Sequence, residues 1–318
     1  MKTLSIGGIK LKNPLFLSPM VDVSDLPYRL ICRESGAGMA YVEMINIEAI
    51  LHENDKTKRI MKTCKEDKPV GLQITSSKVS DFRKVIPHLQ NKGYNLIDIN
   101  CGCPSVRTLD NSSGSALLKA PKKIGNMIKV LKDAGFTTTA KIRLGFKKNN
   151  VLKIAKEIEK AGADALAIHA RLAHHSNKIP ADWSQIKKIK SQIGIPVIGN
   201  GDITNGKQAE EMLEIADGAM IARAAIGDPS IFNRILYYLK TGKEIQFAPE
   251  KNIGLLSKYV SYAEKYEMID LHRIKSVGAN FFRNFHGAAK MRALWMQQKD
   301  FLSIKAILIE SKKGLNVS

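Results

Sequence analysis

The chain has 318 residues, of which 44% are hydrophobic, enough to bury the core of one large domain and a smaller one. Lys and Arg total 50 against 30 Asp and Glu, and the formal net charge of +20 favours a polyanionic partner or an anionic membrane surface. Four cysteines are too few for a disulfide framework, and no apolar run approaches the roughly 20 residues of a membrane span. Because no apolar signal region follows the first residues, we expect a cytoplasmic protein.

Eight short apolar segments recur along the first 240 or so residues. Several are apolar almost throughout, which is typical of parallel strands that are buried on both faces. We therefore predict strands at residues 15–18, 39–43, 70–75, 96–100, 139–143, 165–169, 196–199 and 218–222.

Segments with helical periodicity alternate with these strands, among them residues 80–92, 122–134, 152–161 and 205–215. Glycines follow three of them, as is common where helices end. Eight strand–helix units predict a (β/α)8 TIM barrel, and an open doubly wound sheet is the alternative. Residues 4–11 are expected to form a small hairpin that caps the barrel floor.

Strand signals stop after Gly242, and the chain from about Pro249 onward is predicted to be helical. We therefore expect a catalytic barrel at residues 1–242 and a helical domain at residues 243–318. Active sites of such barrels lie at the carboxyl ends of the strands. Polar residues at the carboxyl ends of the predicted strands are therefore the candidates for the active site.

The predicted fourth strand ends in two cysteines, Cys101 and Cys103, which flank Gly102. A neutral thiol with a pKa of about 8.5 can donate a proton near neutral pH. We interpret Cys101 as a small buried hydrophobic residue. For Cys103 the spacing allows two interpretations, a packing role and a functional role. The other two cysteines lack paired spacing, so we expect no metal site.

Basic residues end the next two predicted strands. Lys141 and Arg143 alternate and therefore point the same way, which in a barrel is inward. A buried lysine needs an anionic partner. That partner is either a neighbouring carboxylate or a reduced flavin, whose reduction a fixed cation near N1 and O2 favours. His169 is placed best for a cofactor, whereas His174 and His175 belong to the following loop.

The last two predicted strands are followed by a pattern that favours phosphate binding. Gly201, between Asn200 and Asp202, permits close approach of the backbone to a ligand. Arg223 follows Ala222 and offers a fork of donors to phosphate oxygens. In barrels of this type the loops after strands seven and eight often hold a phosphate, so we predict a phosphate site here.

Taken together, these segments resemble the tRNA-dihydrouridine synthase family over nearly the whole chain. The matching segments are Ser18-Pro19-Met20, residues 24–29, Gln73, residues 98–104, residues 114–118, Lys141-Ile142-Arg143, His169-Ala170-Arg171, Asn200-Gly201-Asp202 and residues 220–223. Each motif alone is weak evidence, but their order along one barrel is specific. The family usually has glycine where Ala222 and Ala224 stand.

The resemblance implies FMN as the cofactor, with NADPH or NADH as the electron donor. It implies that the flavin ring and ribityl chain contact Ser18, Pro19, Met20, Gln73, Lys141 and His169. It implies that the FMN phosphate contacts Asn200, Gly201, Asp202, Ala222 and Arg223. It also implies hydride transfer from FMN to uracil C6 while Cys103 protonates C5. Asn100, Arg143 and Arg171 are the implied substrate-binding residues.

The implied partner is tRNA, whose target uridine must leave its stack, and no obligatory protein partner is expected. Residues 243–318 contain 13 Lys or Arg and 7 Asp or Glu, so the helical part carries +6 of the total +20. The candidates for phosphate contacts in this part are Arg273, Lys275, Arg283, Lys290 and Arg292. Solvated helix charge is the alternative interpretation of each.

Two other functions fit parts of the sequence. An FMN-dependent dihydroorotate or dihydropyrimidine dehydrogenase would share the barrel and cofactor, but it acts on a free pyrimidine and needs no basic helical domain. A barrel that only binds RNA would have no need of Cys103 and Lys141. The sequence does not indicate which tRNA uridine is reduced.

Overall fold

The computed structural model describes residues 3–315, with side chains described as far as residue 310. Its main sheet has eight parallel strands in the order β3-β10-β9-β8-β7-β6-β5-β4. A parallel bridge between Phe16 and Met39 joins the two outer strands, and this bridge closes the sheet into a barrel. The predicted TIM barrel is therefore confirmed, and the open sheet is excluded.

The strands lie close to their predicted positions. They are β3 (Leu15–Leu17), β4 (Ala40–Asn46), β5 (Val70–Thr75), β6 (Leu96–Cys101), β7 (Thr138–Arg143), β8 (Ala165–His169), β9 (Val197–Asn200) and β10 (Gly218–Ile221). Every residue of β5 and β6 is buried, which explains their nearly continuous apolar sequence. The largest difference is in β4, which runs three residues beyond the predicted end and has an irregular register between Val42 and Ile45.

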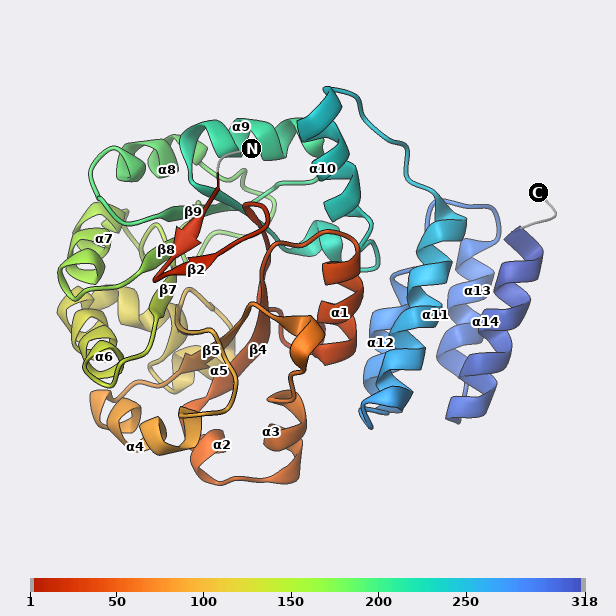
Figure 1. Cartoon of the computed structure of the whole chain (residues 1–318), viewed down its shortest axis with the longest axis horizontal. Coiled ribbons are helices and arrows are strands. Elements are labelled where there is room, and N and C mark those ends of the chain that lie inside the picture. The colour runs from red at the N-terminus through yellow and green to blue at the C-terminus, as the bar shows by residue number, and fades with distance from the viewer. Residues whose placement is uncertain (1–2, 316–318) are drawn as a thin grey trace.

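Helices surround this barrel (Figure 1). They are α1 (Leu26–Glu34), α2 (Ile47–Leu51), α3 (Asp55–Ile60), α4 (Val79–Leu89), α5 (Val106–Asp110), α6 (Pro121–Asp133), α7 (Val151–Lys160), α8 (Trp183–Lys190), α9 (Gly206–Ile215) and α10 (Ile231–Thr241). Local sequence sets several of their starts. At α1, for example, the Asp25 side chain accepts from the Tyr28 N–H at 2.9 Å, and Pro27 lies in the first turn.

The N-terminal hairpin lies across one end of the barrel (Figure 1). Its strands β1 (Ser5–Ile6) and β2 (Ile9–Lys10) pair antiparallel. Leu4, Ile6 and Leu11 are buried in one cluster with strand residues such as Phe16 and Leu96. The hairpin thus fills the amino-terminal end of the barrel, as predicted, and leaves the carboxyl ends of the strands for the site.

The predicted helical region follows the barrel and consists of α11 (Pro249–Lys265), α12 (Leu271–Ala279), α13 (Ala288–Gln297) and α14 (Phe301–Leu315). These helices lie together on the α1 side of the barrel (Figure 1). No helix in residues 3–315 is long and apolar enough to span a membrane.

The helical region packs against the barrel through buried aromatic rings. Tyr28 of α1 makes edge-to-face contacts with Tyr259 and Phe281, whose ring centroids lie 6.0 and 6.3 Å away. The Tyr259 hydroxyl also donates to Asp25 Oδ2 at 3.2 Å. Burial raises the pKa of Asp25 to about 6, although Arg273 nearby opposes the rise. The two parts of the chain therefore share one continuous core.

This interface predicts that the barrel depends on the helical region for stability. Tyr259→Ala should lower the free energy of unfolding by about 3 kcal/mol, because it leaves a cavity beside Tyr28 and removes the Asp25 contact. The matched control is Tyr237→Ala, because Tyr237 is 40% exposed on α10. Thermal and urea unfolding of both variants would test this. A Tyr259→Ala protein as stable as the Tyr237→Ala protein would contradict it.

Candidate active site

The strand register brings the predicted site residues together at one opening of the barrel. Asn100 pairs with Lys141 across β6 and β7, and Arg143 pairs with His169 across β7 and β8. His169 in turn pairs with Asn200 of β9. Residues that are 26 to 41 positions apart in the chain are therefore neighbours on adjacent strands.

A buried network of amides supports the β6 end of this opening. Gln73 donates from Nε2 to Asp98 Oδ2 at 2.7 Å, and its Oε1 accepts from Asn100 Nδ2 at 2.8 Å. Asn100 Oδ1 then accepts from the N–H groups of Gly102 and Cys103 at 3.2 and 3.0 Å. Burial raises the pKa of Asp98 to about 6. The network fixes the turn that carries Cys103.

The two cysteines of this turn differ in access. Cys101 is fully buried, and burial raises the pKa of its thiol. Cys103 is half-buried, and its Sγ lies 3.4 Å from Ser105 Oγ. Its carbonyl accepts from the Ser115 N–H at 2.9 Å and from Thr108 Oγ1 at 3.1 Å. Cys103 is therefore held on a rigid backbone with an accessible thiol.

Cys103 lines a cavity of about 480 Å³ at the β4–β6 side of the opening. Polar walls come from Asn46 and Thr75 at the ends of β4 and β5, and from Arg107 of α5. Carboxylates of Asp22 and Glu43 also line it. The cavity is large enough for a single pyrimidine nucleoside, with the thiol at its wall.

Lys141 stands at the centre of the opening. Its ammonium donates to Asn200 Oδ1 at 3.1 Å, and no carboxylate among the described residues lies within ion-pair distance of it. Burial, reinforced by the charge of Arg143, lowers the pKa of Lys141 to about 8, although Asp98 and Cys103 oppose the shift. A bound anion would relieve this unfavourable environment.

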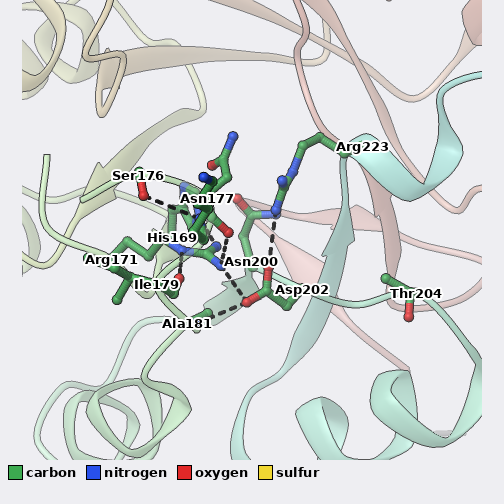
Figure 2. Close-up of polar contacts among 12 residues, drawn as sticks. His169, Arg171, Ser176, Asn177, Ile179, Ala181, Asn200, Asp202, Thr204 and Arg223 are labelled. Atoms are coloured by element: carbon green, nitrogen blue, oxygen red, sulfur yellow. Dashed lines mark hydrogen bonds and ion pairs between the residues drawn. The ribbon is translucent and has the colours of Figure 1, made fainter. Parts of the chain in front are cut away.

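A cluster of cations surrounds the β8–β10 side of the opening (Figure 2). Asp202 lies between two arginines, with Oδ2 at 2.5 Å from Arg171 Nη2 and Oδ1 at 3.1 Å from Arg223 Nη2. The Asp202 carboxylate also accepts from the Ala181 N–H at 2.9 Å. The Arg223 side chain is 55% exposed, so its guanidinium is accessible to an anionic ligand.

His169 faces this cluster as a neutral ring. Burial lowers its pKa to about 2, with further lowering by Lys141, Arg143 and the two arginines of the cluster. Its Nε2 lies 3.0 Å from Arg171 Nη1. Because a guanidinium can only donate, Nε2 accepts and the ring proton resides on Nδ1. His169 can therefore donate from Nδ1 to a ligand in the opening.

The phosphate loop predicted after β9 has a backbone that requires glycine. Gly201 has φ of +124°, and a Cβ there would lie 2.8 Å from Ala181 Cβ. Ala222 has φ of −120° and ψ of −103°, so its backbone is neither helical nor that of a regular strand.

The remaining predicted cofactor residues border the same opening. Ser18 is buried, and its N–H donates to the Ile221 carbonyl at 2.9 Å, which joins the ends of β3 and β10. Pro19 and Met20 follow it and are half-buried. The structure thus places all eleven predicted cofactor residues around one mouth, with Gln73 deepest.

Two of the predicted substrate-binding residues are engaged within the protein. Arg143 donates to the carbonyls of Gly102 and Leu172, at 2.9 and 3.1 Å. Arg171 is 1% exposed and donates to the Ile179 carbonyl at 2.6 Å, besides its contacts with the histidine and aspartate described above. Both guanidinium groups brace the loops of the site in this structure.

The sequence prediction missed the β4 contribution to the cavity. Glu43 and Asn46 lie on a strand whose predicted end was Glu43. The rule that polar residues at strand ends mark the site would have included Glu43. Asn46 was missed because the irregular register lengthens β4 beyond its apolar run.

Comparisons with known proteins find similar sequences over most of the chain. A family model described as dihydrouridine synthase (Dus) matches residues 16–311. The protein from Pseudomonas syringae pv. tomato named tRNA-dihydrouridine synthase B is 35% identical over 309 residues, which cover 94% of this chain and 91% of that protein. The protein of the same name from Proteus vulgaris is 36% identical over 263 residues, 81% of each chain.

Solved structures share the fold at low sequence identity. A variant of NCR from Zymomonas mobilis superposes with a TM-score of 0.53 at 13% identity, over 79% of this chain and 94% of that one. A mutant of morphinone reductase in complex with tetrahydroNAD gives a TM-score of 0.55 at 10% identity, over 79% of this chain and 93% of that one. These similarities establish the barrel architecture.

Burial and the surrounding cations together predict that His169 stays neutral. Its ring should not titrate between about pH 8 and about pH 4, where an unperturbed histidine would. Because the unfolded chain takes up a proton below about pH 6.5, the contribution of His169 to stability should fall as the pH decreases. NMR titration of the imidazole nitrogens, with His169→Gln to assign the signal, measures this. A His169 midpoint near pH 6.5 would show that neither burial nor the cations disfavour the charged ring.

Proposed function

The chain belongs to the dihydrouridine synthase family, and on that premise we propose that its barrel uses FMN to reduce uridines in tRNA, with Cys103 as the general acid. The observation that supports this assignment best is the position of Cys103. Its accessible thiol lines a cavity of nucleoside size, and the neighbouring strand carries Lys141. A proton donor and a cation for an anionic cofactor are thus on adjacent strands.

The residues of the opening fit an FMN molecule. Lys141 is half-buried with only an amide as the hydrogen-bond partner of its ammonium among the described residues, and its pKa is lowered. Arg223 is exposed beside a glycine turn that permits close backbone approach. Two separated cationic positions suit a ligand that is anionic at both its phosphate and its reduced ring.

On this proposal Gly201 and Arg223 would hold the phosphate, and Asp202 orients the Arg223 side chain. Lys141 and the Nδ1–H of His169 would hold the ring. When bound, FMN supplies hydride transfer between NAD(P)H and the uracil ring. The low pKa of His169 keeps its ring neutral, so it donates without adding charge.

Cys103 completes the reduction by donating its Sγ proton to uracil C5. The thiol becomes a thiolate in this step, and it recovers a proton from solvent through the open cavity. Asn100 holds the N–H of Cys103 and therefore sets the position of the thiol. Arg143 holds the preceding carbonyl of Gly102 and braces the same turn.

The substrate class follows from charge as well as from family. Of the total +20, residues 1–242 carry +14, so the barrel itself can attract a polyanion. The cavity mouth contributes exposed Lys56 and Arg107. The target uridine reaches Cys103 by leaving its stack and entering the cavity.

The candidate phosphate contacts of the helical region differ in how they are engaged within the protein. Four of the five have partners: Arg273 has Glu43 and Asp22, Lys275 the Gln298 carbonyl, Arg283 Asp228, and Arg292 the Phe282 carbonyl. Lys290 and Arg292 are exposed. We therefore propose Lys290 first as a tRNA contact of the helical region, whereas the nearly buried Arg273 is engaged by carboxylates.

The two neighbouring cysteines provide a matched test. Cys103→Ala should lower the rate of uridine reduction at least about 100-fold, because it removes the general acid. Reduction of bound FMN by NADPH should persist, because protonation of C5 follows that step. Cys101→Ala should keep most of both activities, because the buried Cys101 has only a packing role.

The two half-reactions are measured separately, the first by flavin absorbance and the second by dihydrouridine formed in tRNA. FMN content and melting temperature serve as controls for folding. Uridine reduction by Cys103→Ala at the wild-type rate would reject the assignment of the acid.

A further inference from the structure

The loop between β3 and α1 is held by a carboxylate from the neighbouring strand. Asp22 adopts φ of +61°, an uncommon conformation for a residue with a side chain. Its N–H donates to Glu43 Oε2 at 2.7 Å. The same loop carries Pro19 and Met20, so Glu43 fixes a segment that borders the proposed cofactor site.

Glu43 is itself held by the C-terminal helices. Arg273 of α12 donates from Nη1 to Glu43 Oε1, and its Nη2 lies 3.3 Å from Asp22 Oδ1. The side chains of Glu43 and Arg273 are only 2% and 11% exposed. Arg273 therefore clamps the tip of the loop and the residue that supports it.

The clamp also sets the charge of the substrate cavity. Asp22 and Glu43 both line the cavity that contains Cys103, and Asp25 lies buried nearby. Without the Arg273 cation, the carboxylates of Asp22 and Glu43 would border a cavity proposed to admit RNA. Burial alone would lower the pKa of Arg273, but its bond to Glu43 leaves the pKa raised, so its charge persists at working pH.

We propose that Arg273 is a positioning residue through which the C-terminal helices order the β3–α1 loop for FMN and neutralise the carboxylates of the substrate cavity. This inference rests on the proposed function for the identity of the ligands. It gives the helical region a role in the barrel's own site, apart from any contact with tRNA. It also assigns Arg273 to the clamp instead of to a phosphate.

The test uses Arg273→Met, Glu43→Gln and the double variant in the full chain. Hydrogen exchange at the Asp22 amide should become at least about tenfold faster in Arg273→Met, because Glu43 loses its anchor. The FMN dissociation constant should rise about tenfold or more, since one partner of a buried pair is left uncompensated. The rate of FMN reduction by NADPH at saturating FMN should change less than about threefold.

The double variant tests whether the loss of FMN affinity in Arg273→Met arises from the unpaired charge of Glu43. Glu43→Gln/Arg273→Met should recover much of the FMN affinity, because the neutral amide needs no counterion and can still accept from Asp22. Lys305→Met is the control, since it breaks the exposed pair with Glu264 within the C-terminal helices. It should change neither exchange at Asp22 nor FMN affinity.

The outcomes separate the clamp from a tRNA contact and from the proposed function. If Arg273→Met weakens tRNA binding and lowers its salt dependence, while Asp22 exchange and FMN affinity match the wild type, Arg273 contacts phosphate and the inference is wrong. If Arg273→Met lowers only the melting temperature, its role is merely structural and the inference is again wrong. Wild-type protein that binds no FMN would reject the proposed function, and Asp22 exchange would still test the clamp.

Discussion

Closure of the parallel sheet is the constraint on which the site depends. The bridge between Phe16 and Met39 joins the two outer strands, and both residues lie in the floor cluster beneath the N-terminal hairpin. Because all eight strands run in the same direction, closure gathers their carboxyl ends into one ring. At the same seam the Leu17 N–H donates to the Met39 carbonyl at 2.9 Å. Packing at the floor thus determines which residues meet at the mouth.

The ring has two chemically different halves. The β4–β6 half presents a thiol and amides that bond to one another, and its carboxylates Asp22 and Glu43 are paired with Arg273, so it suits an uncharged base. The β7–β10 half presents Lys141 and Arg223, with Asp202 as the carboxylate that orients the arginine. Anionic parts of a ligand are favoured there, and burial together with the cations keeps His169 neutral by lowering its pKa. One opening can therefore orient a cofactor and a base against each other.

Much of this arrangement could be predicted from local sequence, because strands buried on both faces are continuous apolar runs. Segments 70–75 and 165–169 coincide with β5 and β8, and the strand-end rule led directly to Cys103 and Lys141. The pairing of Arg273 with Glu43, 230 residues apart, could not be predicted. It depends on how α12 packs against the barrel, which no local pattern encodes. The bond from Arg171 to the Ile179 carbonyl could not be predicted either, since Ile179 lies in an aperiodic loop.

The central claim is that this barrel reduces uridines in tRNA, and position-resolved mapping of dihydrouridine in cellular tRNA tests it most directly. A strain from which the gene has been deleted should lack dihydrouridine at one or more tRNA positions. The purified protein with FMN and NADPH should restore it on that tRNA, while leaving free uracil and orotate derivatives unchanged. Unaltered dihydrouridine at every position in the deletion strain, together with turnover of a free pyrimidine, would contradict the account.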